Sequence, residues 1–184
     1  MFFLLLNIAT ATLYPEPWND EILYIDPAIN LAEGNGFNSS AWPSQSKDEI
    51  WSSNSPLYPI LEAAWIKVFG SELIVTRVLS YIFALFSGIF IYLALKNYNL
   101  VRSEKLRKTC IIFLLMLFPV AYTYRIGRPD ILCLLLASST FAAISFPSSR
   151  LRNTLLIFSL LLIPFANLAL VFFILTIVCV GFLF

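Results

Sequence analysis

Pro17-Trp18-Asn19-Asp20-Glu21 places two adjacent carboxylates directly after the apolar segment 1–13. A second polar stretch, Arg125-Ile126-Gly127-Arg128-Pro129-Asp130, separates two later apolar runs. If both of those runs cross a membrane, the second stretch returns to the same face as the first. We therefore expect the two stretches to form one site at a membrane surface, with Asp20, Glu21 and Asp130 as its carboxylates.

The composition predicts a membrane protein. Of the 184 residues, 59% are hydrophobic and 12% are charged, whereas soluble domains carry roughly 25% charged residues. In lipid, every backbone N–H and C=O needs a partner within the protein, which leaves helical bundles and closed barrels. The long Leu, Ile and Phe runs lack the alternating polarity of barrel strands. We therefore predict an all-α integral membrane protein, a multi-span helical bundle formed by 1–184 as a single domain.

Five apolar segments are expected to span, at about 1–13, 72–95, 109–124, 130–146 and 153–184. The first is shorter than the roughly 20 residues that a bilayer requires and is read as part of a span. A cleaved signal peptide is its competing interpretation, although the segment lacks a basic start. The last is interrupted by Pro164 and Asn167, so one kinked helix and two short helices both remain open.

Residues 14–71 form the predicted outer loop. Within it, 20–33 and 59–69 carry apolar residues at helical spacing and are each followed by a glycine, which predicts two short amphipathic surface helices. Pro27 is expected to disturb the first of them, and Ser71 is expected to cap the following span.

Charge predicts the orientation. Residues 14–70 contain eight acidic residues and two lysines. Two later turns are basic, and by the positive-inside rule they face the cytoplasm, which puts the outer loop and the 125–130 turn on the opposite face. The basic residues of these turns are Lys96, Arg102, Lys105, Arg107, Lys108, Arg150 and Arg152.

The chain contains no histidine, which excludes His-based triads and His-ligated metal sites and leaves carboxylates as bases. Arg125 and Arg128 share a turn with Asp130, and two guanidiniums beside a carboxylate suit a phosphate and a cation together. Two alternatives stay open: Asp130 as a cap of the following helix, and Asp20 with Glu21 as solvated loop charges. The three cysteines lie in or beside apolar runs and are read as packing residues.

The order of these motifs resembles the integral-membrane, lipid-phosphate-dependent glycosyltransferases of the C type, especially the protein O-mannosyltransferase and aminoarabinose-transferase branch. Trp18-Asn19-Asp20-Glu21 with Tyr24, followed by Glu33-Gly34-Asn35-Gly36-Phe37, resembles the family's first outer loop with its Asp-Glu motif. Pro56-Leu57-Tyr58-Pro59 through Gly70 is similar to the helix that leads into the second span, and Arg128-Pro129-Asp130 to the second outer turn. Because members of that family have more spans, the resemblance implies that the chain corresponds to the N-terminal part of such a protein.

The resemblance implies an inverting enzyme that moves a sugar from a polyprenyl phosphate to an acceptor hydroxyl of a protein or lipid on the outer or lumenal face. It puts the family's catalytic Asp at Asp20, with Glu21 and Asp130 as further catalytic residues and Arg125 and Arg128 at the donor phosphate. A divalent cation, Mg²⁺ or Mn²⁺, would be held by Asp20 and Asp130. We expect a bacterial inner-membrane protein with its site facing the periplasm and no nucleic-acid partner.

Two other classes compete with this interpretation: a small transporter or channel subunit, and a non-catalytic membrane assembly partner. In a transporter, ionisable residues within the spans would mark the pathway. Here Glu72, Arg77 and Asp130 are predicted at helix ends, which argues mildly against that class.

Overall fold

A computed structural model of the 184-residue chain describes residues 2–42, 45–46, 48–52, 55–168 and 171–172. Within these ranges it contains eight helices and no strand, so the predicted all-α class is confirmed. The distal part of the predicted segment 153–184, residues 169–170 and 173–184, lies outside the described residues.

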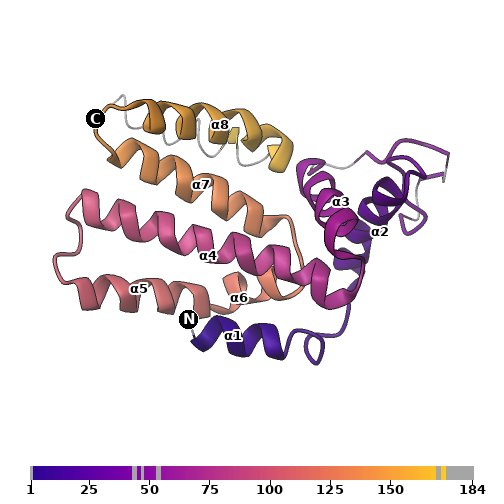
Figure 1. Ribbon diagram of the computed structural model, residues 1–184, viewed down its shortest axis with the longest axis horizontal. Coiled ribbons are helices and arrows are strands. Elements are labelled where there is room, and N and C mark those ends of the chain that lie inside the picture. Colours follow the sequence, from indigo (N-terminus) through magenta and orange to yellow (C-terminus); the bar gives the residue numbers. More distant parts are fainter. Residues whose placement is uncertain (1, 43–44, 47, 53–54, 169–170, 173–184) are drawn as a thin grey trace.

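Helix α4 (Leu73–Asn97) is the longest helix and lies at the centre of the bundle, between α7 (Asp130–Ser145) and α5 (Glu104–Met116) (Figure 1). Its start matches the prediction, but the cap does not: Glu72 occupies the N-cap position and makes no side-chain capping bond. The prediction for Ser71 is therefore wrong. The helix forms because 25 residues without Pro and with few charges can each satisfy their backbone within the segment.

The predicted span 109–124 is broken. Helix α5 is followed by α6 (Phe118–Arg125), and the two meet at an angle of 63°. Pro119 stands in the first turn of α6, where its missing N–H costs nothing, but the same ring cannot continue α5. The break turns Arg125, at the end of α6, toward the N-terminal segment.

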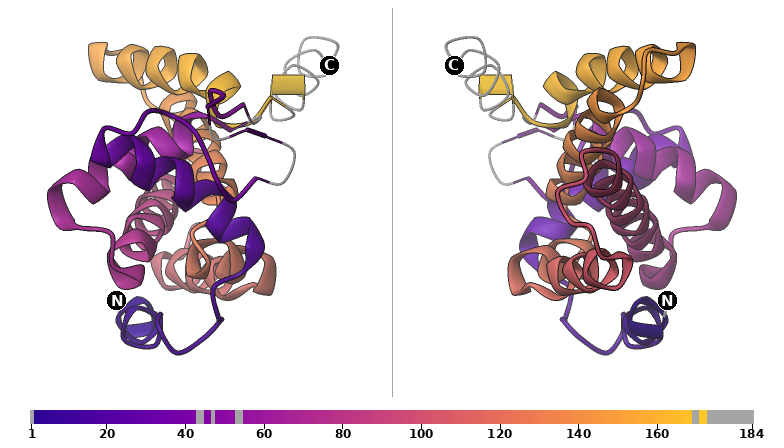
Figure 2. Two further views of the ribbon diagram at one scale, coloured as in Figure 1. Left: turned by 90° about the vertical axis from the view of Figure 1, so that its right-hand side faces the viewer. Right: turned by 90° about the vertical axis from the view of Figure 1, so that its left-hand side faces the viewer.

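Helices α1 (Phe2–Ala9) and α8 (Arg150–Ala166) lie on opposite sides of the α4–α7 pair (Figures 1 and 2). Helix α1 is shorter than the predicted segment 1–13. Helix α8 starts at the N-cap Ser149, whose hydroxyl accepts a bond from the Arg152 N–H, and passes Pro164 before it ends at Ala166.

The outer loop carries the two predicted helices, α2 (Asn19–Glu33) and α3 (Leu57–Phe69). Gly34 ends α2 in the left-handed conformation, with φ at 84°, which a residue without Cβ adopts at little cost. Helix α2 runs unbroken through Pro27, contrary to the expected disturbance.

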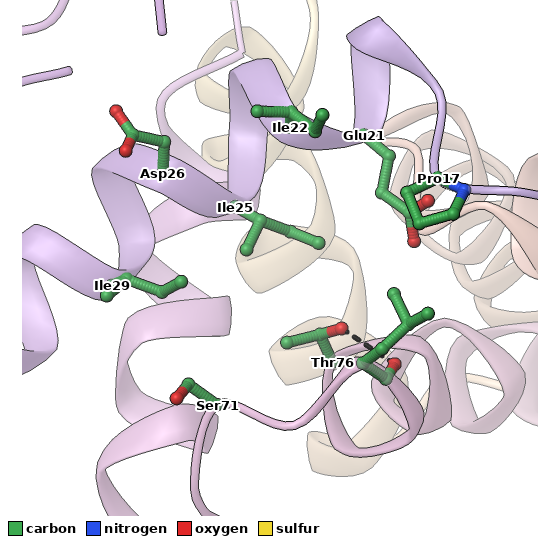
Figure 3. A pocket seen from close by; sticks show the side chains of 9 residues that line it. Pro17, Glu21, Ile22, Ile25, Asp26, Ile29, Ser71 and Thr76 are labelled. Carbon is green, nitrogen blue, oxygen red and sulfur yellow. Dashed lines mark hydrogen bonds between the residues drawn. The ribbon is translucent and has the colours of Figure 1, made fainter. Parts of the chain in front are cut away.

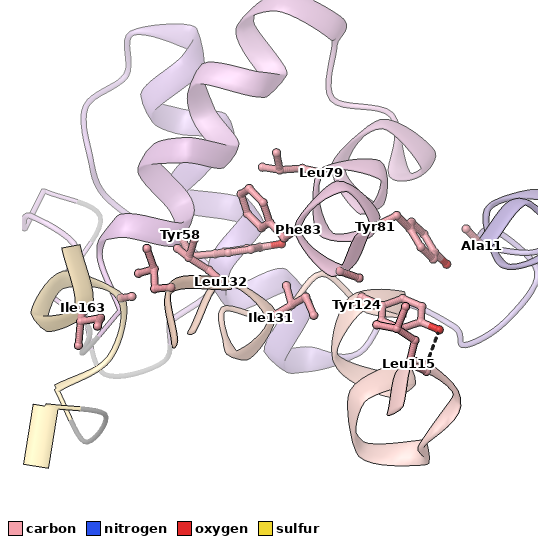
Figure 4. Close-up of a cluster of buried hydrophobic side chains, with 13 residues drawn as sticks. Ala11, Tyr58, Leu79, Tyr81, Phe83, Leu115, Tyr124, Ile131, Leu132 and Ile163 are labelled. Atoms are coloured by element: carbon pink, nitrogen blue, oxygen red, sulfur yellow. Dashed lines mark hydrogen bonds between the residues drawn. The ribbon is translucent and has the colours of Figure 1, made fainter. Parts of the chain in front are cut away.

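The main core joins side chains from α3 to α8 (Figure 4). Tyr58 meets Phe83 edge to face, with ring centroids 6.5 Å apart, and Tyr81 lies 5.2 Å from Tyr124. Because Tyr58 comes from α3, this packing anchors the outer loop to the central helices.

Among the described residues, α4 is long and apolar enough to cross a membrane, and the bent α5–α6 pair would be a second if it formed one span. The basic turns before α5 and before α8 lie at one end of the bundle, and α2 and α3 at the other (Figure 1). This arrangement agrees with the predicted separation of basic turns from the outer loop.

Candidate functional site

Asp20 and Asp130 meet through one guanidinium. The Nη1 of Arg128 donates to Oδ2 of Asp20 at 2.9 Å, and its Nε donates to Oδ2 of Asp130 at 2.8 Å. Asp20 lies in the first turn of α2, whereas Asp130 begins α7, 110 positions later. The three side chains are between 33% and 43% exposed. A ligand that arrives from outside can therefore reach both carboxylates.

The turn before α7 fits closely against the outer helices. Gly127 has φ at 61°, and a Cβ at this position would lie 3.3 Å from the Tyr58 hydroxyl and 3.8 Å from Oε1 of Glu21. Glycine is required here by both the backbone conformation and the space. The turn is therefore pressed onto α2 and α3, which fixes Arg128 between the two acids.

Asp130 does not cap α7 in this structure. No side-chain capping bond is formed at the start of the helix, and the carboxylate instead accepts the bond from Arg128. Asp130 also lies in the first turn of α7, where a negative charge meets the positive helix end, so both interpretations that the sequence left open remain.

Glu21, next to Asp20 in the sequence, points into the protein and forms a buried ion pair with Arg77. Arg77 Nε and Nη2 donate to the two Glu21 oxygens at 2.7 and 2.6 Å, and both residues are fully buried. The remaining nitrogen, Nη1, donates to the backbone oxygens of Ala11 and, at 3.0 Å, of Pro15. Such bidentate pairs are strong and directional. Every nitrogen of Arg77 and both oxygens of Glu21 are thereby used.

Glu21 was predicted to be catalytic, and its pairing with Arg77 was not predicted. The signal was present, because an arginine within an apolar helix must find a counter-charge or pay a large desolvation cost. The identity of that partner, 56 residues away, depends on how α2 folds over α4.

Arg125 does not join Arg128. Its guanidinium donates to the Asn7 side chain, to Thr10 and to the backbone oxygen of Tyr14. It therefore fastens the end of α6 to the end of α1, and its contacts place it away from the Asp20–Asp130 pair.

Glu62 on α3 is a further buried carboxyl, which the sequence analysis did not single out. It is fully buried, and neither of its oxygens has a hydrogen-bond partner of good geometry among the described residues. Burial raises the pKa of Glu62 to about 8; the nearby Tyr58 hydroxyl lowers it in part, and the Glu21 charge raises it. That hydroxyl is itself 2.9 Å from the Ser80 hydroxyl. At neutral pH the Glu62 carboxyl is thus mainly protonated.

An apolar groove of about 270 Å³ runs along α2, between its Ile residues and the start of α4 (Figure 3). Ile22, Ile25 and Ile29 line one side, Thr76 lines the other, and Pro17 and Glu21 stand at one end. The groove begins at the same first turn of α2 that carries Asp20.

The rest of the outer loop is fastened to α2 by Asp26. Its Oδ2 accepts bonds from the Ser39 hydroxyl at 2.8 Å, the Ser40 N–H at 2.7 Å and the Ala41 N–H at 3.2 Å. Trp51 packs edge to face on Tyr24, with centroids 5.9 Å apart. The loop therefore covers α2 without covering Asp20.

The described residues contain no group of three or more His, Cys, Asp or Glu side chains that could hold a metal ion. Asp20 and Asp130 supply two carboxylates, and the Arg128 guanidinium lies between them. A magnesium ion would fit there only with further oxygens, such as those of a donor phosphate, as is usual for this ion.

Comparison with protein-family models, with curated proteins and with solved structures finds no match to this chain.

Glu21→Gln should lower the free energy of unfolding by about 3–5 kcal/mol, because it leaves Arg77 buried without a counter-charge. Asp20→Asn, one residue away, should cost roughly 0–1 kcal/mol, since its pair with Arg128 is partly exposed. Denaturant unfolding of the purified proteins in detergent, followed by tryptophan fluorescence, measures both. Equal losses for the two variants would contradict the buried pair.

Glu62 should make stability depend on pH. The unfolded carboxyl ionises near its ordinary pKa of 4.5, whereas the folded one keeps its proton up to about pH 8. The folded protein binds more protons in this window, so its stability falls as pH rises from 4.5 to about 8 and then levels off. Glu62→Gln removes this slope. The Tm of the variant minus that of the parent should therefore grow across the window.

The matched control for that measurement is Glu49→Gln, an exposed acid of the same loop, which should leave the pH dependence of Tm unchanged. A Tm difference between Glu62→Gln and the parent that stays constant from acid to alkaline pH would show that folding does not raise the pKa of Glu62.

Proposed function

We propose that the protein is a membrane-embedded glycosyltransferase of the C type, which moves a sugar from a polyprenyl phosphate to an acceptor hydroxyl. The observation that supports the proposal is the Asp20–Arg128–Asp130 cluster. It joins the two stretches that carry the resemblance, and it remains accessible at one end of the bundle.

The membrane setting is part of the proposal. Helix α4 is long enough to cross, α5 with α6 and the shorter α7 are apolar, and the basic turns gather at the end opposite the cluster. In a bilayer this separation puts the basic turns in the cytoplasm and the cluster outside.

Asp20 is assigned the role of general base. In the proposed reaction its carboxylate takes the proton of the acceptor hydroxyl while that oxygen attacks the anomeric carbon. The bond from that carbon to the phosphate oxygen breaks on the opposite face, so the configuration inverts, and polyprenyl phosphate leaves with the bonding electrons. A carboxylate exposed by 40% is accessible to such a hydroxyl.

Arg128 is the residue assigned to the donor phosphate. Guanidinium groups bind phosphate in a planar, two-pronged geometry, and a positive charge beside the departing phosphate stabilises the transition state. Asp130 orients Arg128 through its Nε bond. A divalent cation, where bound, would add positive charge at the same phosphate.

Glu21 is assigned a positioning role rather than proton transfer. Both of its oxygens are bound by Arg77, and the residue is fully buried. The apolar groove along α2 begins beside it and supplies a surface for the apolar part of a substrate.

A non-catalytic assembly partner is the second candidate. It is favoured by one observation: Arg128 already bonds both carboxylates, and such a cluster would also serve as a clamp between α2 and α7. A transporter would need its buried charges on a pathway, but Glu21 and Arg77 neutralise each other.

Asp20→Asn should reduce sugar transfer by roughly 100-fold or more, the usual scale for loss of a general base. The measurement uses membranes that carry the natural protein, supplied with radiolabelled mannosyl, glucosyl and aminoarabinosyl polyprenyl phosphates, and follows the release of polyprenyl phosphate. Asp48→Asn, an exposed acid of the outer loop, is the control and should transfer as the parent does. Full activity of Asp20→Asn would remove Asp20 from the mechanism. No release by the parent from any donor would favour the assembly partner.

Cysteine labelling tests the membrane orientation. With the native cysteines replaced by alanine, single cysteines at Leu100 and Ser148 should react with a membrane-impermeant maleimide only after the cytoplasmic side is opened. One at Ser46 should react in intact cells, because the basic turns face inward and the acidic loop outward. All three positions are exposed. Labelling of Leu100 in intact cells would reverse the orientation.

A further inference from the structure

A second groove lies between α4 and α5, toward the basic end of the bundle. It has a volume of about 350 Å³, and its walls are mainly apolar. Leu85, Ile89 and Ile112 line it and are each between 42% and 50% exposed. Tyr92 and Lys108 complete the lining and are the polar residues of the groove.

The floor of this groove is set by Gly88. A Cβ at Gly88 would lie 3.2 Å from Cγ2 of Ile111 and 3.4 Å from Cδ1 of Leu115. Because Gly88 has no side chain, α5 approaches α4 closely there. Leu85 and Ile89 flank Gly88 in the sequence and form the sides of the groove. The result is a groove between α4 and α5.

The polar residues place positive charge on this groove. Lys108 has an exposed ammonium, which pairs with Glu104 at 2.6 Å. Arg107 is buried, and its guanidinium carbon lies 5.6 Å from the Tyr92 ring centroid. Its Nη1 donates to the Val101 oxygen at 2.8 Å and to that of Arg102 at 3.2 Å.

One donor of Arg107 is unused. Its Nε is buried and has no hydrogen-bond partner among the described residues, although an unmade bond on a buried charged group is costly. Tyr92 touches both Arg107 and the groove. Arg107 does not line the groove, but its positive charge lies against Tyr92, which does. The exposed ammonium of Lys108 is the cation that a ligand in the groove can reach.

We propose that this groove binds an anionic phospholipid, with an acyl chain along Leu85, Ile89 and Ile112 and the phosphate at the exposed ammonium of Lys108. A phosphate accepts a charge-assisted bond from the Lys108 ammonium, and basic pockets between helices at the cytoplasmic side favour anionic headgroups. The excess of basic over acidic residues at this end selects against a zwitterionic lipid. The inference rests on the proposed membrane setting but not on the proposed transfer reaction, because lipid binding is measured without a donor sugar.

The test is lipid-dependent stabilisation of the purified protein in a neutral detergent. Phosphatidylglycerol should raise the Tm and remain bound in native mass spectrometry, whereas phosphatidylcholine and inorganic phosphate should do neither. Lys108→Gln should weaken phosphatidylglycerol binding by about threefold to tenfold, because it removes one charge contact with the headgroup. Lys105→Gln, on the same helix but outside the lining, should change it much less.

A filling variant tests the groove separately from the charge. Ile89→Trp occupies the groove and should abolish the phosphatidylglycerol shift, while Phe86→Trp, equally exposed but outside the lining, should keep it. Equal shifts with phosphatidylcholine, an equal shift with inorganic phosphate, or an unchanged shift in Ile89→Trp would each overturn the proposal. None of these outcomes bears on Asp20, so failure here and failure of the transferase are distinguishable.

Discussion

The buried pair of Glu21 and Arg77 is the contact on which the outer end of this protein depends. Arg77 rises from α4 and binds a side chain of α2 together with two backbone oxygens of the segment between α1 and α2. Successive residues on a helix differ by about 100° in direction. Because Glu21 is held in the interior, the neighbouring Asp20 points in a different direction, toward the surface. The structural role of one acid therefore bears on the exposure of the other, and the adjacent pair divides into a buried anchor and a partly exposed carboxylate.

Arginine serves the same purpose twice more. Arg125 joins the end of α6 to α1, and Arg128 joins the start of α7 to α2. Apolar packing is non-directional and cannot alone fix the register of a loop on a bundle. A guanidinium can fix the position of a loop, because each of its several donors requires an acceptor in one direction. Gly127 completes this arrangement, since a side chain there would push the turn away from Tyr58.

The sequence was informative where the signal is local. Apolar length predicted α4, and glycine predicted the ends of α2 and α3. The order of the apolar segments also predicted that Asp20 and Asp130 lie at the same end of the bundle, because in helices that alternate in direction every second turn returns to one face. It did not predict which acid would be buried, since Asp20 and Glu21 are chemically alike and only the position of Arg77 separates them. Glu62 was missed because an amphipathic pattern shows that a face is covered, but not that a carboxyl lies beneath it.

The bonds of Arg128 also bear on how the proposed reaction would begin. Arg128 is shared by two carboxylates. A donor phosphate carries its own negative charge and competes for the same guanidinium, whose donors fit phosphate as well as carboxylate. Each carboxylate accepts one bond from Arg128. The bond to Asp20 is partly exposed and joins two separate parts of the chain, whereas Asp130 is only two residues from Arg128 and moves with it. Arrival of the phosphate would therefore release Asp20 first. The base would become free only when the donor is in place, which couples proton removal from the acceptor to the presence of a sugar to receive it.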